Sequence, residues 1–179
     1  NRGNNFLADY VQSRGKNRFR DREILPYTYI TSQNLAMKSD YFIQMGGQDP
    51  AIRSYGGDIE FAYRLERNVS ISVIYNKRAL SYTTWNKSMD NMLGQMQEFG
   101  SVTLPYIKQK HPELKKAFRI DLVTAAGFKK FLLKLSINSY VARIFPIMLH
   151  CVPASLRKMM IHYLFFQSIV KGYDSGQKK

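Results

Sequence analysis

The sequence contains a single cysteine, Cys151, among its 179 residues. One cysteine excludes an intramolecular disulfide bond and a zinc site built from cysteines, and it fits a reducing compartment. The three histidines, at positions 111, 150 and 162, are far apart and lack the spacing of metal ligands. We therefore predict no metal site among the residues of this chain.

Long uncharged apolar runs are missing as well. A membrane-spanning helix needs about 18 or more apolar residues in succession, and charged residues interrupt every apolar stretch before that length. The sequence has no Walker A loop, no Gly-x-Gly-x-x-Gly fingerprint, no nucleophile elbow and no RNA-binding signature. An initiating methionine and a signal-like segment are also missing, so we expect the chain to be part of a longer polypeptide.

Acidic residues are scarce in the last third of the sequence. Residues 1–114 contain 15 basic and 11 acidic side chains, whereas residues 115–179 contain 12 basic and only 2 acidic ones. This last part reads as helices in which apolar residues alternate with lysines and arginines, with breaks expected at Pro146, Pro153 and Gly172. Basic amphipathic helices of this kind can lie on an anionic membrane surface. The alternative is that they pack on the domain and expose their lysines to water.

The sequence that is present has 45% hydrophobic and 13% aromatic residues, which indicates a folded chain. Extended segments are expected at 24–37, 69–75 and 79–85, where valine, isoleucine and tyrosine residues recur. A short helix is expected from the N-cap Ser39 to Met45, and a long one from the N-cap Ser88 to about Lys110.

The most informative stretch is 53–67, in which two adjacent glycines lead into an acidic residue and a helical pattern. Asp58 and Glu60 lie in the expected first turn and complement the helix dipole, and Asn68 is the expected left-handed C-cap. Glycines let the backbone approach a ligand closely, and the helix start holds a carboxylate beside them. Asp58 is therefore either an active-site acid or an ordinary helix cap, and local features leave both interpretations open.

The order of the motifs resembles the second half of a family 2 glycosyltransferase, which has the GT-A fold. The resemblance covers roughly residues 25–100 and rests on three segments: Ser32–Phe42, Gly46-Gly-Gln-Asp49 and Tyr55-Gly-Gly-Asp-Ile-Glu-Phe-Ala-Tyr-Arg-Leu65. It implies an α/β fold. Residues 1–115 would form the acceptor-side half of a GT-A catalytic domain, with part of its mixed sheet and helices. Residues 116–179 would form a basic amphipathic helical extension.

The same resemblance implies inverting transfer of a sugar from a nucleotide-sugar donor to a saccharide or lipid-linked acceptor, in polysaccharide or glycan biosynthesis. Asp58 matches the family's general base. The positions implied to line or order the substrate cleft are Asn34, Gly46, Gly47, Asp49, Tyr55, Gly57, Glu60, Arg64 and Trp85. Of these, Tyr55 and Trp85 would stack on a sugar face, although aromatic side chains more often pack in a core.

The resemblance also implies a divalent metal, Mg²⁺ or Mn²⁺, in the full-length enzyme, with its ligands mostly outside these residues. It further implies a cytoplasmic location at the inner face of the membrane. The sequence departs from the family pattern at Gly57, where a glutamate is usual, and it has no Asp-x-Asp motif because the donor-binding first half of the fold is not in it. We expect these residues alone to be inactive.

Two other classes fit the charge: a non-catalytic membrane-associated module and a nucleic-acid-binding module. The second is disfavoured because the basic residues lack interleaved aromatics, so no nucleic-acid partner is expected.

Overall fold

The computed structural model describes residues 6–12, 19–82, 87–124 and 139–177. The chain divides into two compact units. Residues 11–86 form one of them, called the mixed unit below, and residues 1–10 together with 87–179 form the other, called the helical unit. These units divide the chain at different points from the predicted boundary after residue 115. The segment 87–115 belongs to the helical unit, because its helices pack on the last helix of the chain.

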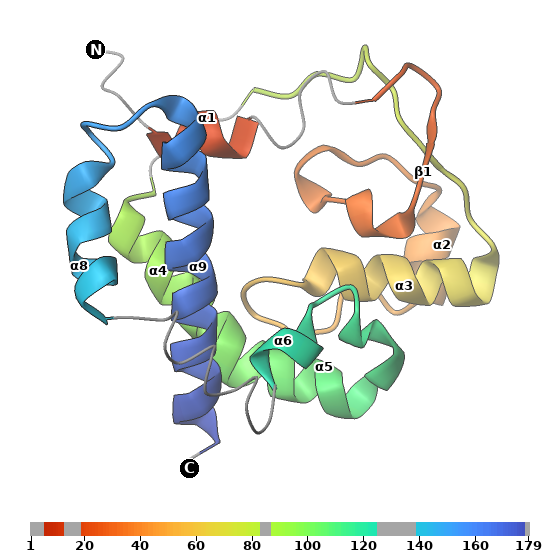
Figure 1. Ribbon diagram of the computed structural model, residues 1–179. Helices are drawn as coiled ribbons and strands as arrows, with labels where there is room; N and C mark the ends of the chain where they lie inside the picture. Colours follow the sequence, from red (N-terminus) through yellow and green to blue (C-terminus); the bar gives the residue numbers. More distant parts are fainter. Residues whose placement is uncertain (1–5, 13–18, 83–86, 125–138, 178–179) are drawn as a thin grey trace. The chain divides into compact units, whose positions relative to one another are not determined.

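The described part of the chain is mostly helical, with a small antiparallel sheet of two strands (Figure 1). This composition is compatible with the α/β class. Within the same residues, no helix combines the length and the apolar character needed to cross a bilayer.

The sheet in the mixed unit is shorter than the sequence predicts. Strand β1 (Ile24–Leu25) pairs antiparallel with β2 (Val73–Ile74), and Ile24 lies opposite Ile74. The expected extended segment 24–37 turns after β1 into the 3-10 turns η1 (Tyr27–Tyr29) and η2 (Ser32–Asn34). Pro26 offers no backbone N–H to a neighbouring strand, and its carbonyl instead accepts a hydrogen bond from the N–H of Tyr29 at 3.0 Å.

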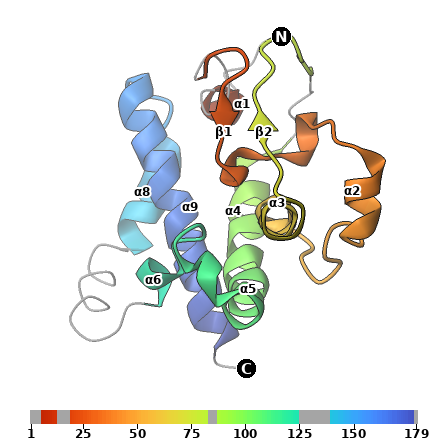
Figure 2. The same cartoon turned by 90° about the vertical axis from the view of Figure 1, so that its right-hand side faces the viewer.

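Two helices complete the mixed unit (Figure 2). Helix α2 (Ser39–Gln44) forms as predicted, but Ser39 is its first residue and Lys38 holds the N-cap position without a side-chain hydrogen bond. Helix α3 (Gly57–Val69) follows the left-handed Gly56, whose φ is 99°.

The end of α3 differs from the prediction. Asn68 stays within the helix and donates its side-chain amide to the carbonyl of Arg64 at 2.7 Å. Ser70 adopts the left-handed conformation instead, with φ of 49°, and this delays the start of β2 to Val73.

The helical unit begins with the predicted long helix. Ser88 caps it, since its hydroxyl accepts a hydrogen bond from the N–H of Asn91 at 3.2 Å. The helix runs as α4 (Met89–Glu98), a π-helical turn η3 (Phe99–Thr103) and α5 (Leu104–Lys110). The π-helical turn ends two residues before Pro105, which cannot donate a hydrogen bond to the carbonyl four residues before it.

The last helix, α9 (Ala154–Gly176), lies along α4 and η3 and forms the centre of the helical unit (Figure 1). Three glycines line the crossing. A Cβ atom at Gly100 would overlap the carbonyl of Ile169, and one at Gly172 would overlap the carbonyl of Gln97. A Cβ at Gly176 would lie 2.7 Å from the carbonyl oxygen of Ser101. The prediction that Gly172 ends the helix is therefore wrong, because this glycine serves close packing between helices.

Smaller helices complete the helical unit: α1 (Phe6–Gln12, of which residues 6–10 belong here), η4 (Pro112–Lys115), α6 (Ile120–Val123) and α8 (Ser139–Met148). Tyr10 of α1 packs edge-on against His162 and Phe165 of α9, with ring centroids 5.0 and 5.6 Å apart. The predicted break at Pro153 is confirmed, since this residue is the N-cap of α9. The predicted break at Pro146 is wrong, because α8 continues past it for two residues.

Candidate functional site

The mixed unit contains an open pocket of about 500 Å³. Its wall comes from the segment between η1 and α2, from α2 and the turn after it, and from the first half of α3. The lining residues are Ile30, Ser32, Leu35, Ala36, Met37, Ser39, Phe42, Ile43, Gln48, Asp58 and Phe61. Most of these side chains are apolar, and Asp58 is the charged one among them.

Asp58 is the second residue of α3 and is partly buried. The side-chain amide of Gln48 donates a hydrogen bond of 3.1 Å to its Oδ1 atom. The orphan N–H groups of the helix start lie at the same end of α3 as this side chain, and their partial positive charge suits an acidic residue in the first turn. The site therefore presents an oriented negative charge, and a carboxylate in this setting can accept a proton from a hydroxyl group or bind a cationic group.

Glu60, two residues later, is fully buried and faces a different partner. Its two carboxylate oxygens accept hydrogen bonds from Arg64, from Nε at 2.9 Å and from Nη2 at 3.0 Å. The i,i+4 spacing on one helix face brings the two side chains together, and the two-point geometry is the strong form of an arginine–carboxylate pair. Because Glu60 is engaged and buried, Asp58 is the carboxylate of the first turn that remains for a ligand.

Arg64 also ties α3 to the end of α2. Its Nη1 atom donates to the carbonyl of Met45 at 2.5 Å, and its Nη2 atom donates to the carbonyl of Gly47 at 2.7 Å. The first carbonyl belongs to the C-cap of α2 and the second to the glycine turn that follows it. Arg64 thus satisfies two partly buried acceptors on a second segment while it neutralises Glu60, and it holds the Gly46–Gly47 turn against α3.

The turn itself requires glycine. Gly46 and Gly47 have φ of 68° and 72°, in the left-handed region. The N–H of Gly47 donates to the carbonyl of Phe42 at 3.0 Å and that of Gly46 to Ile43 at 2.9 Å, which is the Schellman pattern of a helix end. A Cβ at Gly47 would lie 3.2 Å from Cζ of the Phe42 ring. This ring lines the pocket, so the turn and the pocket wall are packed as one element.

Four other predicted site residues are not among the residues that line the pocket. Asp49 closes a local turn, with its Oδ1 atom accepting from the N–H of Ala51 at 2.9 Å. Asn34 donates its side-chain amide to the carbonyl of Ala79 at 2.8 Å. Tyr55 is exposed to 38% just before α3. Trp85 lies outside the described residues.

The structure thus brings Asp58 into the pocket and places Gly46, Gly47, Glu60 and Arg64 behind it as a support. The N-terminal residue of α3, Gly57, has its Cβ position 3.7 Å from the side chain of Ile52, which is ordinary contact.

Sequence reasoning missed the apolar wall and Gln48. The wall combines segments that are separated in the chain and only meet in the fold. For Gln48 a signal existed, because it lies inside the Gly-Gly-Gln-Asp motif.

Among the described residues, no group of three or more His, Cys, Asp or Glu side chains is arranged to hold a metal ion. Comparisons of the chain with protein-family profiles, with curated proteins and with solved structures found no match. The geometry of the pocket and the motif pattern therefore carry the functional argument.

Proposed function

We propose that this chain is the acceptor-side part of an inverting, nucleotide-sugar-dependent glycosyltransferase of the family 2 type, with Asp58 as the general base. One observation carries the proposal: of the two acids in the first turn of α3, Asp58 lines the pocket while Glu60 is buried in its pair with Arg64. The tandem-glycine segments of the motif pattern would then serve to build and brace the site that presents this acid.

The proposed reaction needs one positioned carboxylate on the acceptor side. An acceptor hydroxyl in the pocket would donate its proton to Asp58 as its oxygen attacks the anomeric carbon of the sugar, while the bond from that carbon to the nucleoside diphosphate breaks. In-line attack inverts the configuration. The hydrogen bond from Gln48 would hold the carboxylate in one orientation during the transfer.

The apolar wall of the pocket indicates which kind of acceptor would fit. A pocket lined by Met37, Phe42 and Phe61 around one carboxylate suits a saccharide that presents an apolar ring face, or a lipid-linked acceptor. In this proposal the donor, and a Mg²⁺ or Mn²⁺ ion that would neutralise the diphosphate, are held mostly by residues outside this chain. The described residues do not form a metal site themselves.

The proposal extends to the fold and to the location. The short β1–β2 pair would be the edge of a larger GT-A mixed sheet, with residues 1–115 as the catalytic half and 116–179 as an extension. Action at the inner, cytoplasmic face of a membrane is supported by the excess of basic over acidic residues in the last third of the sequence.

The test is Asp58→Asn in the full natural polypeptide, assayed by transfer of label from a panel of nucleotide sugars to a membrane extract of the source cells. We expect kcat to fall by about 10²–10⁴-fold with little change in KM, because the proton acceptor is lost. The matched control is Asp90→Asn, since Asp90 is also the second residue of a helix, α4, but is exposed in the helical unit.

The control should keep wild-type activity. An Asp58→Asn protein that is folded and fully active would refute the general-base role. A natural polypeptide that turns over no nucleotide sugar in the panel would count against the glycosyltransferase itself.

A further inference from the structure

Helix α8 is apolar on more than one side. Its sequence, Ser-Tyr-Val-Ala-Arg-Ile-Phe-Pro-Ile-Met, contains one charged residue in ten. One side packs on α9: the ring of Phe145 contacts that of Tyr163 with centroids 5.0 Å apart, and Leu149, directly after the helix, is buried. A helix that is apolar all round normally has all its faces covered.

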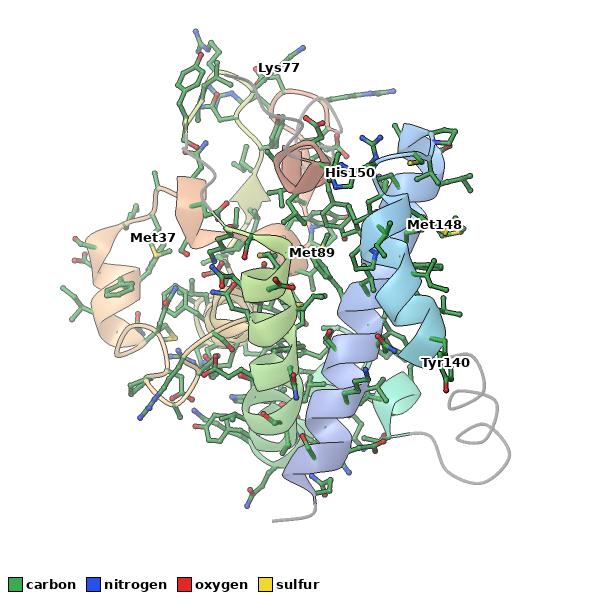
Figure 3. All side chains as sticks on the ribbon, turned by 90° about the vertical axis from the view of Figure 1, so that its left-hand side faces the viewer. Met37, Lys77, Met89, Tyr140, Met148 and His150 are labelled. Carbon is green, nitrogen blue, oxygen red and sulfur yellow. The ribbon has the colours of Figure 1, made fainter. Side chains whose placement is uncertain are left out.

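The opposite side of α8 faces solvent. Ile144 is exposed to 52%, Ile147 to 73% and Met148 to 42%. Their spacing of three and four residues puts them on one helix face, called the outer α8 face below. Tyr140, one turn earlier, is exposed to 74%. In Figure 3, Tyr140 and Met148 point away from α9.

The start of α9 adds a similar surface. Leu156 is exposed to 46% and Met159 to 61%, three residues apart, with the exposed Lys158 between them. Large apolar side chains that gather on neighbouring helices mark a surface that binds something.

Charge indicates what would cover this surface. The sequence has no acidic residue between Asp121 and Asp174, while seven basic residues lie in that interval: Lys129, Lys130, Lys134, Arg143, Arg157, Lys158 and Lys171. A second copy of the chain would bring the same cationic segment against itself and be repelled. A partner rich in negative charge is favoured instead.

We propose that the outer α8 face inserts into the interface of a lipid bilayer that contains anionic lipids. An exposed apolar helix face within a strongly basic stretch of sequence is the pattern of helices that lie in the membrane plane, where the apolar face enters the boundary between headgroups and acyl chains. A ten-residue helix is about 15 Å long and fits this boundary without spanning the membrane. The proposal does not depend on glycosyl transfer, because binding is measured without turnover.

The first experiment is co-sedimentation of the full natural polypeptide with phosphatidylcholine vesicles, with and without phosphatidylglycerol. We expect binding to require phosphatidylglycerol. The variant Ile144→Ser/Ile147→Ser should lower the partition coefficient by about tenfold or more, because two apolar side chains no longer leave water.

The matched control is Ile24→Ser, since Ile24 in the mixed unit is exposed to 70%, close to the 73% of Ile147. This control should bind like the wild type. Far-ultraviolet circular dichroism checks that each variant is folded.

The second experiment uses Cys151, which is exposed, three residues beyond α8, and the single cysteine of the sequence, so that a fluorophore attached to it reports on this place within residues 1–179. If other parts of the natural polypeptide contain cysteines, they are first replaced by serine. We expect the emission of an environment-sensitive fluorophore to shift to the blue with anionic vesicles, and to be quenched by a quencher attached to the lipid headgroup.

Three results would overturn the proposal. One is equal binding by the wild type and the double variant, which would mean attraction by charge alone. Another is anionic-vesicle binding with no change in the fluorophore, which would mean contact through a different surface. The third is an absence of binding to the anionic vesicles; if the chain then self-associates and the double variant does not, the face belongs to a second copy.

Discussion

The crossing of α4 and α9 predicts opposite effects for the same substitution at two glycines. Gly172 faces the backbone of Gln97, and a Cβ atom there would overlap the Gln97 carbonyl. Gly94 lies inside α4 with nothing within 4 Å of its Cβ position. Both residues are inside helices, so the change to alanine adds the same helix propensity at each and differs only in packing.

At Gly94 the change to alanine should raise the free energy of unfolding by about 0.5–1 kcal/mol, which is the ordinary gain of alanine over glycine in a helix. At Gly172 the same gain is opposed by overpacking, which costs about 1–3 kcal/mol or more where backbone rather than a flexible side chain must move. The net effect at Gly172 should be a loss of about 1–2 kcal/mol.

Urea denaturation followed by circular dichroism at 222 nm measures both effects, because the helical unit contains most of the helical residues. By thermal denaturation, the two variants should lie on opposite sides of the wild type, at about 2–4 °C per kcal/mol. If Gly172→Ala is as stable as Gly94→Ala, the helices do not approach as closely as the structure has them, and the reasoning fails.

The two remaining predictions concern side chains that make hydrogen bonds, and each compares one substitution with a second variant. Arg64→Met should lower the free energy of unfolding by about 3–5 kcal/mol in urea denaturation, because it leaves the buried Glu60 without its counter-charge. The double variant Glu60→Leu/Arg64→Met should recover part of this loss but not the part due to the hydrogen bonds from Arg64 to the carbonyls of Met45 and Gly47. A double variant less stable than Arg64→Met would contradict this explanation. Ser88→Ala should lower the free energy of unfolding by about 0.5–2 kcal/mol, because it removes the cap of α4. Ser39→Ala, at a helix start with no side-chain cap bond, should lower it by less than about 0.5 kcal/mol in the same assay. Equal losses would contradict the assignment of the caps.

Local signals predicted the elements around the candidate site well. The start of α3 after the tandem glycines, the position of Asp58 in its first turn and the Gly46–Gly47 end of α2 all follow from residues that are neighbours in sequence. Such features depend on the conformational freedom of glycine and on the helix dipole, and both act within one turn.

Contacts between distant segments could not be predicted in this way. The i,i+4 spacing of Glu60 and Arg64 permits an ion pair, but only the fold shows that Arg64 also reaches the carbonyls of Met45 and Gly47. Gly172 has the sequence signature of a helix end, and its role appears only when the partner helix is in place. Predicted strands were too long because a strand persists only where a neighbouring strand accepts and donates its hydrogen bonds.

The interleaving of the two units has a consequence for the order of folding. The mixed unit is one continuous segment, 11–86, whereas the helical unit brings α1 and α4 onto α9 at the other end of the chain. Contacts such as that between Gly100 and Ile169 join residues roughly 70 positions apart, and the loop between them must close before they form. During synthesis the mixed unit can therefore complete its contacts first, while the sides of α4 and η3 that pack on α9 stay uncovered until α9 has left the ribosome.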